Sequence, residues 1–480
     1  MMTRRSMLSN GSAFALVTLL AIAAGAQTPA QTPTQSPTPS TRDADVFSAA
    51  VVAARHALAA DRGRLWHARL DTLQWMGFEN GQVWLTADPR VPGYTRTGAT
   101  WTGPLPAGIT PSNTSVTWNG KRWAMVLLPL PSDSALTLRL LIHEAMHTTQ
   151  PTVLPVPKYD ETGAGSGLLD EAVGRSWMRL EWRALAAALA ATGHTRDDAV
   201  RDALVFRAAR YAAATDDEIT RERALDVSEG IPEYTGWRLS HSPRSAFVAS
   251  LDSAPRQLAS FVRGFPYYTG PAYAFLLDDY QGAAWHPLLR MAPDLQRQLL
   301  LAWREHATPD AYNALVYDVL SGTPLTADQR EALTAHANVL AERYGAAAIH
   351  AEEDTRWATR QRQLAEYRAK FVSGPTIRLR PATLSISFNP RGQASLGADG
   401  TVMANLAWRG PNGATLTAPD GALVTPTWTE VRVPRGTVQL APGVLTAPLS
   451  LRGDGWALEL PAGWTVTADG ESLVLSPGKP

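Results

Sequence analysis

At 480 residues the chain is too long for one ordinary hydrophobic core, and we expect two or three folding units. The composition is that of a globular protein, with 45% hydrophobic and 18% charged residues, and the formal net charge of zero gives no electrostatic reason to expect nucleic acid as a partner. Cysteine is absent, which excludes disulfides, thiolate zinc sites and a lipobox.

Residues 1–26 have the pattern of an export signal. Arg4 and Arg5 supply a positive segment, and the apolar run 13–24 is too short for a comfortable membrane span. Residues 3–8 also resemble a twin-arginine signal. We therefore predict an exported protein, periplasmic or extracellular, with no stable membrane insertion after signal cleavage. An uncleaved membrane anchor is the alternative.

A Pro/Thr-rich linker is predicted at 27–42, because such a composition cannot bury apolar area. It is followed by a small α+β subdomain at 43–130. Apolar residues at helical spacing predict a helix from Asp43 to about Trp75, and a strand is predicted at 82–87.

Two further strands, at 115–118 and 122–129, are joined by Asn119-Gly120, which is the strongest short hairpin signal. The edge of a sheet can pair with an extended peptide. We therefore predict a substrate-edge strand in this subdomain. A strand buried inside the sheet would have the same sequence pattern.

The middle of the chain, 131–372, is almost wholly helical in pattern. Beyond the helix at 136–150 discussed below, helices are predicted at 168–191, 197–214, 218–238, 243–263, 270–280 and 287–306, and one very long helix or two helices at 327–371.

From 373 to 480 the sequence changes to short alternating runs separated by Gly and Pro, which predicts an all-β, sandwich-like domain of around seven strands. It contains no cluster of catalytic residue types. It could bind substrate, the cell envelope or a protein partner, or it could only cap the helical domain. The whole chain is thus predicted to be a multidomain α+β protein.

The most informative stretch is the predicted helix at 136–150, which contains His143, Glu144 and His147 in the pattern His-Glu-x-x-His. Residues four apart lie on the same face of a helix, so both imidazoles can bind one Zn²⁺. Glu144 lies beside them and can act as general base for a water that the metal activates. The alternative is a pair of surface histidines without a metal.

A catalytic zinc takes three protein ligands and leaves one position for water. A metzincin would have Gly at 150 and His at 153, and the chain has Gln150 and Val153, so that class is excluded. A glutamate from a following helix can complete the site instead. The candidates are Glu171, Glu181, Glu229 and Glu233.

Residues 228–234, Ser-Glu-Gly-Ile-Pro-Glu-Tyr, resemble the N-E-G-x-x-x-Y segment of the aminopeptidase-N-like gluzincins, and 267–270, Tyr-Tyr-Thr-Gly, match their Y-x-x-G segment. Together with the His-Glu-x-x-His pattern, these motifs occur in the order found in that family. The region 130–285 is also similar to exported bacterial proteins of the peptidase-MA-like group. The resemblance implies that Glu229 is the third zinc ligand and that Tyr267 stabilises the oxyanion, with Tyr268 as the alternative donor.

The chain departs from this family in three respects. The gap before Glu229 is longer, so residues 168–214 are expected to fold away from the site. Pro232 requires a helix that begins near Ser228. The G-x-M-E-N segment that recognises a free α-amine is missing, since 77–80 is one residue short, and aminopeptidase specificity is therefore not predicted.

The resemblance implies a helical zincin catalytic domain and an exported zinc metallopeptidase. It would hydrolyse peptide bonds of a peptide or protein substrate through a zinc-activated water, with Glu144 as general base. One alternative is an inactive peptidase-like protein whose C-terminal β domain mediates an interaction. Another is a zinc hydrolase that acts on a non-peptide amide or a cell-wall peptide.

Overall fold

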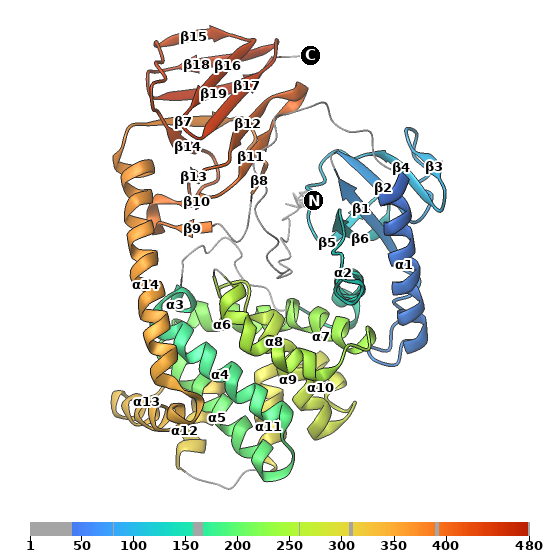
Figure 1. Cartoon of the computed structure of the whole chain (residues 1–480), viewed down its shortest axis with the longest axis vertical. Helices are drawn as coiled ribbons and strands as arrows, with labels where there is room; N and C mark the ends of the chain where they lie inside the picture. Colours follow the sequence, from blue (N-terminus) through green and yellow to red (C-terminus); the bar gives the residue numbers. More distant parts are fainter. Residues whose placement is uncertain are drawn as a thin grey trace, which may run out of the picture. The chain divides into compact units, whose positions relative to one another are not determined.

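The computed structural model describes residues 41–79, 81–156, 167–258, 260–306, 311–388 and 393–478. The predicted signal peptide and almost all of the predicted linker lie outside these residues. The chain divides into two compact units, Met1–Pro151 and Thr152–Pro480. A region rich in strands is followed by a helical region and then by a second β region, which confirms the predicted α+β class (Figure 1). The finer division at 130 and 372 stays a prediction.

The first unit contains a six-stranded sheet with the order β3-β4-β2-β1-β6-β5, in which only the β1–β6 pair is parallel. Its elements are α1 (Thr41–Asp61), β1 (Gln74–Glu79), β2 (Gln82–Leu85), β3 (Thr95–Thr97), β4 (Thr100–Pro104), β5 (Thr114–Trp118), β6 (Lys121–Leu127) and α2 (Ser134–Val153), whose last turn crosses into the second unit.

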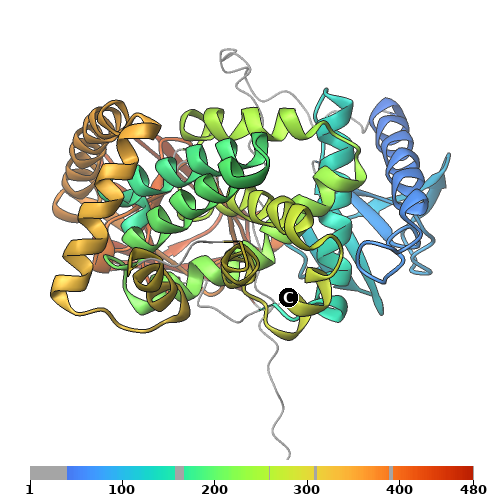
Figure 2. The same cartoon turned by 90° about the horizontal axis from the view of Figure 1, so that it is seen from below.

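Both helices lie along this sheet, and alternate residues of β1 separate its two faces (Figures 1 and 2). Trp75 donates from its indole nitrogen to the carbonyl oxygen of Leu141 on α2, at 3.3 Å. A Cβ added at Gly77 would contact the ring of Phe47 on α1. The intervening Met76 belongs to a separate apolar cluster on the other face, with Val83, Leu85, Trp123 and Met125.

Two predictions for this unit are wrong in part. The helix predicted to reach Trp75 ends at Asp61, because Arg62 and Gly63 adopt positive φ angles of 56° and 74° that a right-handed helix cannot continue, and Trp75 lies in β1. The strand predicted at 122–129 is not an edge strand, because β6 pairs with β1 on one side and with β5 on the other. β3 and β5 are the outer strands of the described sheet.

The predicted hairpin is confirmed. β5 and β6 are joined by Asn119 and Gly120, with φ angles of 48° and 70°, as a two-residue hairpin turn of the mirror-image type requires.

The second unit begins with a helical region in which α4 packs against α5, α8, α9 and α14 (Figure 2). Its helices are α3 (Gly167–Asp170), α4 (Ala172–Ala190), α5 (Gly193–Tyr211), α6 (Asp216–Ser228), α7 (Gly230–Leu239), α8 (Arg244–Gln257), α9 (Pro266–Gln281), α10 (Trp285–Met291), α11 (Leu295–Arg304), α12 (Ala311–Ser321), α13 (Ala327–Ala341) and α14 (Ala346–Arg368). The helices predicted at 218–238 and 287–306 are each two helices, and α12 lies in a part of the helical middle for which no separate helix was predicted.

A buried ion network joins α4, α5 and α6. Glu181 forms ion pairs with Arg207 at 2.9 Å and with Arg210 at 2.6 Å. Arg207 also pairs with Asp226 at 2.7 Å, and Arg210 pairs with Glu222 at 2.8 Å. Three carboxyl groups thus face two guanidinium groups in a site closed to solvent. Burial raises the pKa of Asp226 to about 7, although Arg207 opposes that rise.

The C-terminal region is a two-sheet sandwich, as predicted. An eight-stranded sheet (β15-β18-β19-β7-β14-β13-β10-β9) and a five-stranded sheet (β16-β17-β12-β11-β8) enclose one apolar cluster, to which Leu379 and Val433 contribute from the first sheet and Trp408 and Leu458 from the second. The strands are β7 (Thr376–Pro381), β8 (Ile386–Ser387), β9 (Gln393–Ser395), β10 (Thr401–Met403), β11 (Leu406–Arg409), β12 (Thr415–Ala418), β13 (Ala422–Val424), β14 (Val431–Pro434), β15 (Gly443–Thr446), β16 (Leu449–Gly453), β17 (Trp456–Leu460), β18 (Trp464–Ala468) and β19 (Ser472–Pro477).

The described residues thus hold more strands here than the seven predicted, because strands of two to four residues carry too little alternation to be recognised in a sequence. Leu364 of α14 and Phe371 of the π-helix η2 (Ala369–Ser373) pack against Val402 and Leu423 of the eight-stranded sheet.

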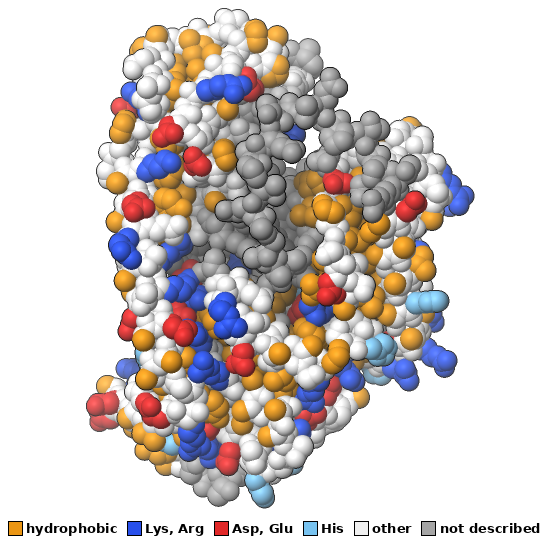
Figure 3. All heavy atoms as spheres, viewed as in Figure 1, with side chains coloured by type: hydrophobic (Ala, Val, Ile, Leu, Met, Phe, Trp, Pro, Cys, Tyr) orange, Lys and Arg blue, Asp and Glu red, His pale blue; other side chains and the backbone are white. Residues whose placement is uncertain are grey.

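Positive and negative side chains are interspersed on the face shown in Figure 3, in keeping with the formal net charge of zero. No described helix is long and apolar enough to cross a membrane.

Candidate metal centre

Helix α2 presents the His-Glu-x-x-His residues on a buried face. Its first turn is capped by Asp133, whose Oδ1 accepts hydrogen bonds from the backbone N–H groups of Ala135 at 2.8 Å and Leu136 at 3.0 Å. The exposed fractions of His143, Glu144 and His147 are 0%, 0% and 7%. These three polar side chains are therefore shielded from bulk water, and the cost of burying them has to be offset by partners inside the protein.

The helix continues three residues beyond its predicted end at 150 and ends at Val153, so Pro151 lies in its last turn. Proline at 151 leaves the carbonyl of His147 without the usual helical N–H donor. Arg122 on β6 supplies a replacement, since its Nη2 lies 3.4 Å from that oxygen. The sheet therefore supports the last turn of the helix at the position of the second histidine.

The two imidazoles face each other. Nε2 of His143 and Nε2 of His147 are 3.0 Å apart, and the ring planes are inclined by 68°. Two ligands of a tetrahedral ion with bonds of about 2.0–2.1 Å lie about 3.3 Å apart, which is close to the observed separation. The pair is thus compatible with a shared metal ion, as the spacing of four residues predicts.

Glu229 lies where one helix ends and the next begins. Helix α6 starts with a capping box, in which Thr215 and Glu218 bind each other's backbone N–H groups, and it ends at Ser228. The N–H of Glu229 donates to Leu225 and its carbonyl accepts from Glu233, so helical hydrogen bonding continues through it. Pro232 then falls in the first turn of α7, as predicted.

Tyr267 contacts Glu229 directly. Its hydroxyl donates to Oε2 of Glu229 at 2.8 Å, and the exposed fractions of the two residues are 8% and 5%. The backbones behind them are in contact, since a Cβ added at Gly230 would lie 2.7 Å from the Cα of Gly270. Tyr268, the alternative, instead directs its hydroxyl toward Oε1 of Gln257 at 3.4 Å.

One ring nitrogen each from His143 and His147 and one carboxylate oxygen of Glu229 all lie within 4.8 Å of one another, and all three residues are buried. Within the described residues, no second group of His, Asp or Glu meets this criterion. Two imidazoles and one carboxylate are a set of donors that catalytic zinc sites use, so the residues present fit that metal.

The other candidate glutamates have different surroundings. Glu181 is fully buried, forms ion pairs with Arg207 and Arg210, and accepts a hydrogen bond from Tyr273 at 2.8 Å. Glu171 is exposed at the start of α4, and Glu233 is buried on α7 but does not belong to the histidine group. Of the four candidates, the group includes only Glu229.

Helix α4 belongs to the segment 168–214 that was expected to fold away from the site, and it packs against α9, which carries Tyr267. Trp182 of α4 donates from its indole nitrogen to Oγ1 of Thr269 at 3.2 Å. Sequence reasoning missed this support, and it also missed the contact between the two motif glycines. The available signal was glycine inside two helical patterns, where it lowers helix stability and therefore indicates a close approach.

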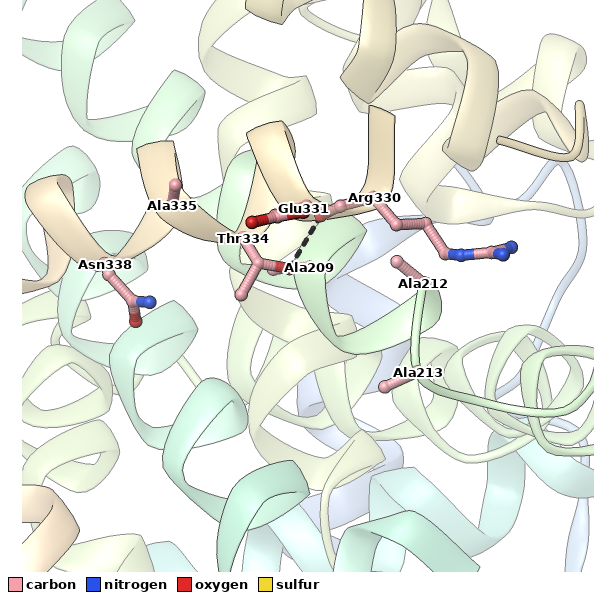
Figure 4. Close-up of a pocket in the computed structure, with 8 residues that line it drawn as sticks. All are labelled: Ala209, Ala212, Ala213, Arg330, Glu331, Thr334, Ala335 and Asn338. Atoms are coloured by element: carbon pink, nitrogen blue, oxygen red, sulfur yellow. Dashed lines mark hydrogen bonds between the residues drawn. The ribbon is translucent and has the colours of Figure 1, made fainter. Parts of the chain in front are cut away.

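A separate pocket of about 380 Å³ lies between α5 and α13 (Figure 4). Four of its residues are alanines, and Oγ1 of Thr334 is bonded to the carbonyl oxygen of Arg330 in its own helix at 2.8 Å. Its lining shares no residue with the histidine group. The pocket therefore contributes nothing to the candidate metal centre.

A scan of protein-family models, a search of curated proteins and a search of solved structures each find no match to this chain.

Proposed function

We propose that the protein is an exported metallopeptidase that holds one zinc ion with His143, His147 and Glu229. The observation that carries the proposal is the buried group formed by these three residues. Zinc suits this set of donors, since two imidazoles and one carboxylate would fill three positions and a fourth is left for water or substrate.

The chemistry divides between the metal and the chain. A zinc ion held here would polarise the substrate carbonyl and lower the pKa of a water molecule. Glu144 would accept the proton of the attacking water and return it to the departing amine. Glu144 follows His143 directly on α2 and is fully buried, so its carboxyl group is shielded from bulk water.

The substrate class proposed is a peptide or protein. It rests on the order of the three motifs, His-Glu-x-x-His, Glu-Gly-x-x-x-Tyr and Tyr-x-x-Gly, and export rests on the pattern of residues 1–26. The C-terminal sandwich is proposed to contact the cell envelope or a protein partner.

The test is metal content by elemental analysis of the mature protein, followed by a screen with internally quenched peptides. We expect about one zinc per chain in the wild type and a sharp loss in Glu229→Ala. Glu171→Ala is the matched control, because Glu171 is an exposed glutamate outside the group. A wild type that takes up no zinc after reconstitution contradicts the proposal and favours the inactive binding protein.

A further inference from the structure

We propose that Tyr267 is a positioning residue for the metal ligand Glu229, and that the contact between Gly230 and Gly270 holds it in that role. This inference rests on the proposed function. It differs from the oxyanion role that the resemblance implies for Tyr267, and it concerns the affinity of the protein for its metal.

The first argument is that the hydroxyl group of Tyr267 has a single hydrogen, which it donates to Glu229. Tyr267 donates it to Oε2 of Glu229 at 2.8 Å, in surroundings from which water is largely excluded. A hydroxyl has only one hydrogen to donate. While it is bonded to Glu229 it cannot stabilise an oxyanion, and it restricts rotation of the carboxylate instead.

The second argument is that the backbone imposes this pairing. A Cβ at Gly270 would lie 2.4 Å from the Cα of Gly230 and 3.0 Å from the carbonyl oxygen of Asp226, so α9 approaches the junction of α6 and α7 as closely as a backbone can. Glu229 precedes one glycine directly, and Tyr267 precedes the other by three residues, which is about one helical turn.

The third argument is that α9 is anchored on both sides of the contact. Thr269 accepts from Trp182 at 3.2 Å, and Tyr273 donates to the buried Glu181 at 2.8 Å. A helix held by these bonds cannot slide or rotate freely. The hydroxyl of Tyr267 is therefore presented to Glu229 by a rigid element.

Hydrogen bonds to metal-ligating side chains orient them, and their loss typically weakens metal binding by about 10–100-fold. We therefore expect Tyr267→Phe to weaken zinc binding by about that factor, as measured by competition with a chromophoric chelator. Tyr268→Phe is the matched control, since it removes the neighbouring hydroxyl, and it is expected to leave zinc affinity unchanged.

A double-mutant cycle separates positioning from a general structural effect. In a Glu229→Gln background, Tyr267→Phe is expected to cause no further loss of metal affinity, because the carboxylate on which it acts is gone. Titration with Co²⁺, whose absorption reports ligand geometry, provides a second readout. The unfolding temperature of each variant shows that the fold is kept.

Two results would overturn the inference and leave the proposed function intact. One is unchanged zinc affinity in Tyr267→Phe with reduced turnover, which is the behaviour of an oxyanion donor. The other is an equal loss of affinity in the wild-type and Glu229→Gln backgrounds. A wild type that binds neither Zn²⁺ nor Co²⁺ overturns both the inference and the proposed function.

Discussion

Gly230 and Gly270 are in direct backbone contact, and this contact brings two sequence motifs together. A Cβ at Gly270 would lie 2.4 Å from the Cα of Gly230, a separation that real side chains do not adopt. The Glu-Gly and Tyr-x-x-Gly motifs therefore share one structural requirement, which is that neither glycine has room for a side chain. The hydrogen bond between Tyr267 and Glu229 is the consequence.

Gly270→Ala is expected to lower the free energy of unfolding by about 1–3 kcal/mol, the cost of inserting a methyl group into a packed contact. In an exposed helix the same change would stabilise by up to about 1 kcal/mol. Denaturant unfolding measures the sign. In the double variant with Gly230→Ala the second change should cost less than it does alone, because the first has already separated the helices. A gain in stability for Gly270→Ala would contradict the close contact.

Glu144→Gln is expected to keep about one zinc per chain and to lower turnover of a cleaved peptide by at least about 100-fold, since amide and carboxylate are similar in shape but only the carboxylate accepts the proton. Elemental analysis and a fluorescent peptide assay check the two halves of this prediction. Full activity in the variant would show that Glu144 is not the base. Glu171→Gln, on an exposed glutamate, serves as the control.

Zinc is expected to raise the unfolding temperature of the metal-free protein, because a ligand that binds only the folded state stabilises it. At a free metal concentration of 100 times Kd, the gain is about 2.7 kcal/mol. Differential scanning calorimetry before and after chelation measures it. His147→Ala should abolish most of the response, whereas His194→Ala, at a fully exposed histidine, should leave it unchanged. An equal response in all three proteins would place the metal elsewhere.

Asp226 is expected to make the protein less stable as the pH rises from about 4 to about 7. Burial raises the pKa of this carboxyl from 3.8 to about 7 in the folded state, so the folded protein binds a proton that the unfolded chain releases. The stabilisation from the proton bound by Asp226 is complete below the pKa of the unfolded chain, and it is lost as the pH rises through the pKa of the folded state. It is on the order of 4 kcal/mol.

The asparagine in Asp226→Asn does not titrate, so this component of the pH dependence of stability should be missing from the variant. The comparison of wild type and variant by denaturant unfolding at pH 4, 5.5 and 7.5 isolates the component from the other carboxyl groups, such as Glu181, whose pKa is lowered. Parallel pH profiles in the two proteins would contradict the prediction.

Two features were predictable from the sequence because they depend on neighbours in the chain. The spacing of His143 and His147 places both on one face of α2, whatever surrounds that helix, and Asn119-Gly120 determines the turn between β5 and β6 through its own backbone preferences. The alternation of apolar and polar residues after 373 similarly identified a sandwich, although not its shortest strands.

The rest depended on contacts between distant residues. Glu229 follows His147 by 229 − 147 = 82 residues, and only the resemblance of residues 228–234 to the gluzincin segment favoured it over Glu181, which proves to balance Arg207 and Arg210 inside the helical region. The interior position of β6 depends on β1, which is far earlier in the chain. Sequence alone determined which residues can bind a metal and which lie on one helical face, because these follow from side-chain chemistry and local geometry. Only the tertiary structure decided which carboxylate joins the histidines and which tyrosine contacts it, because burial, ion pairing and helix packing act between residues that are distant along the chain.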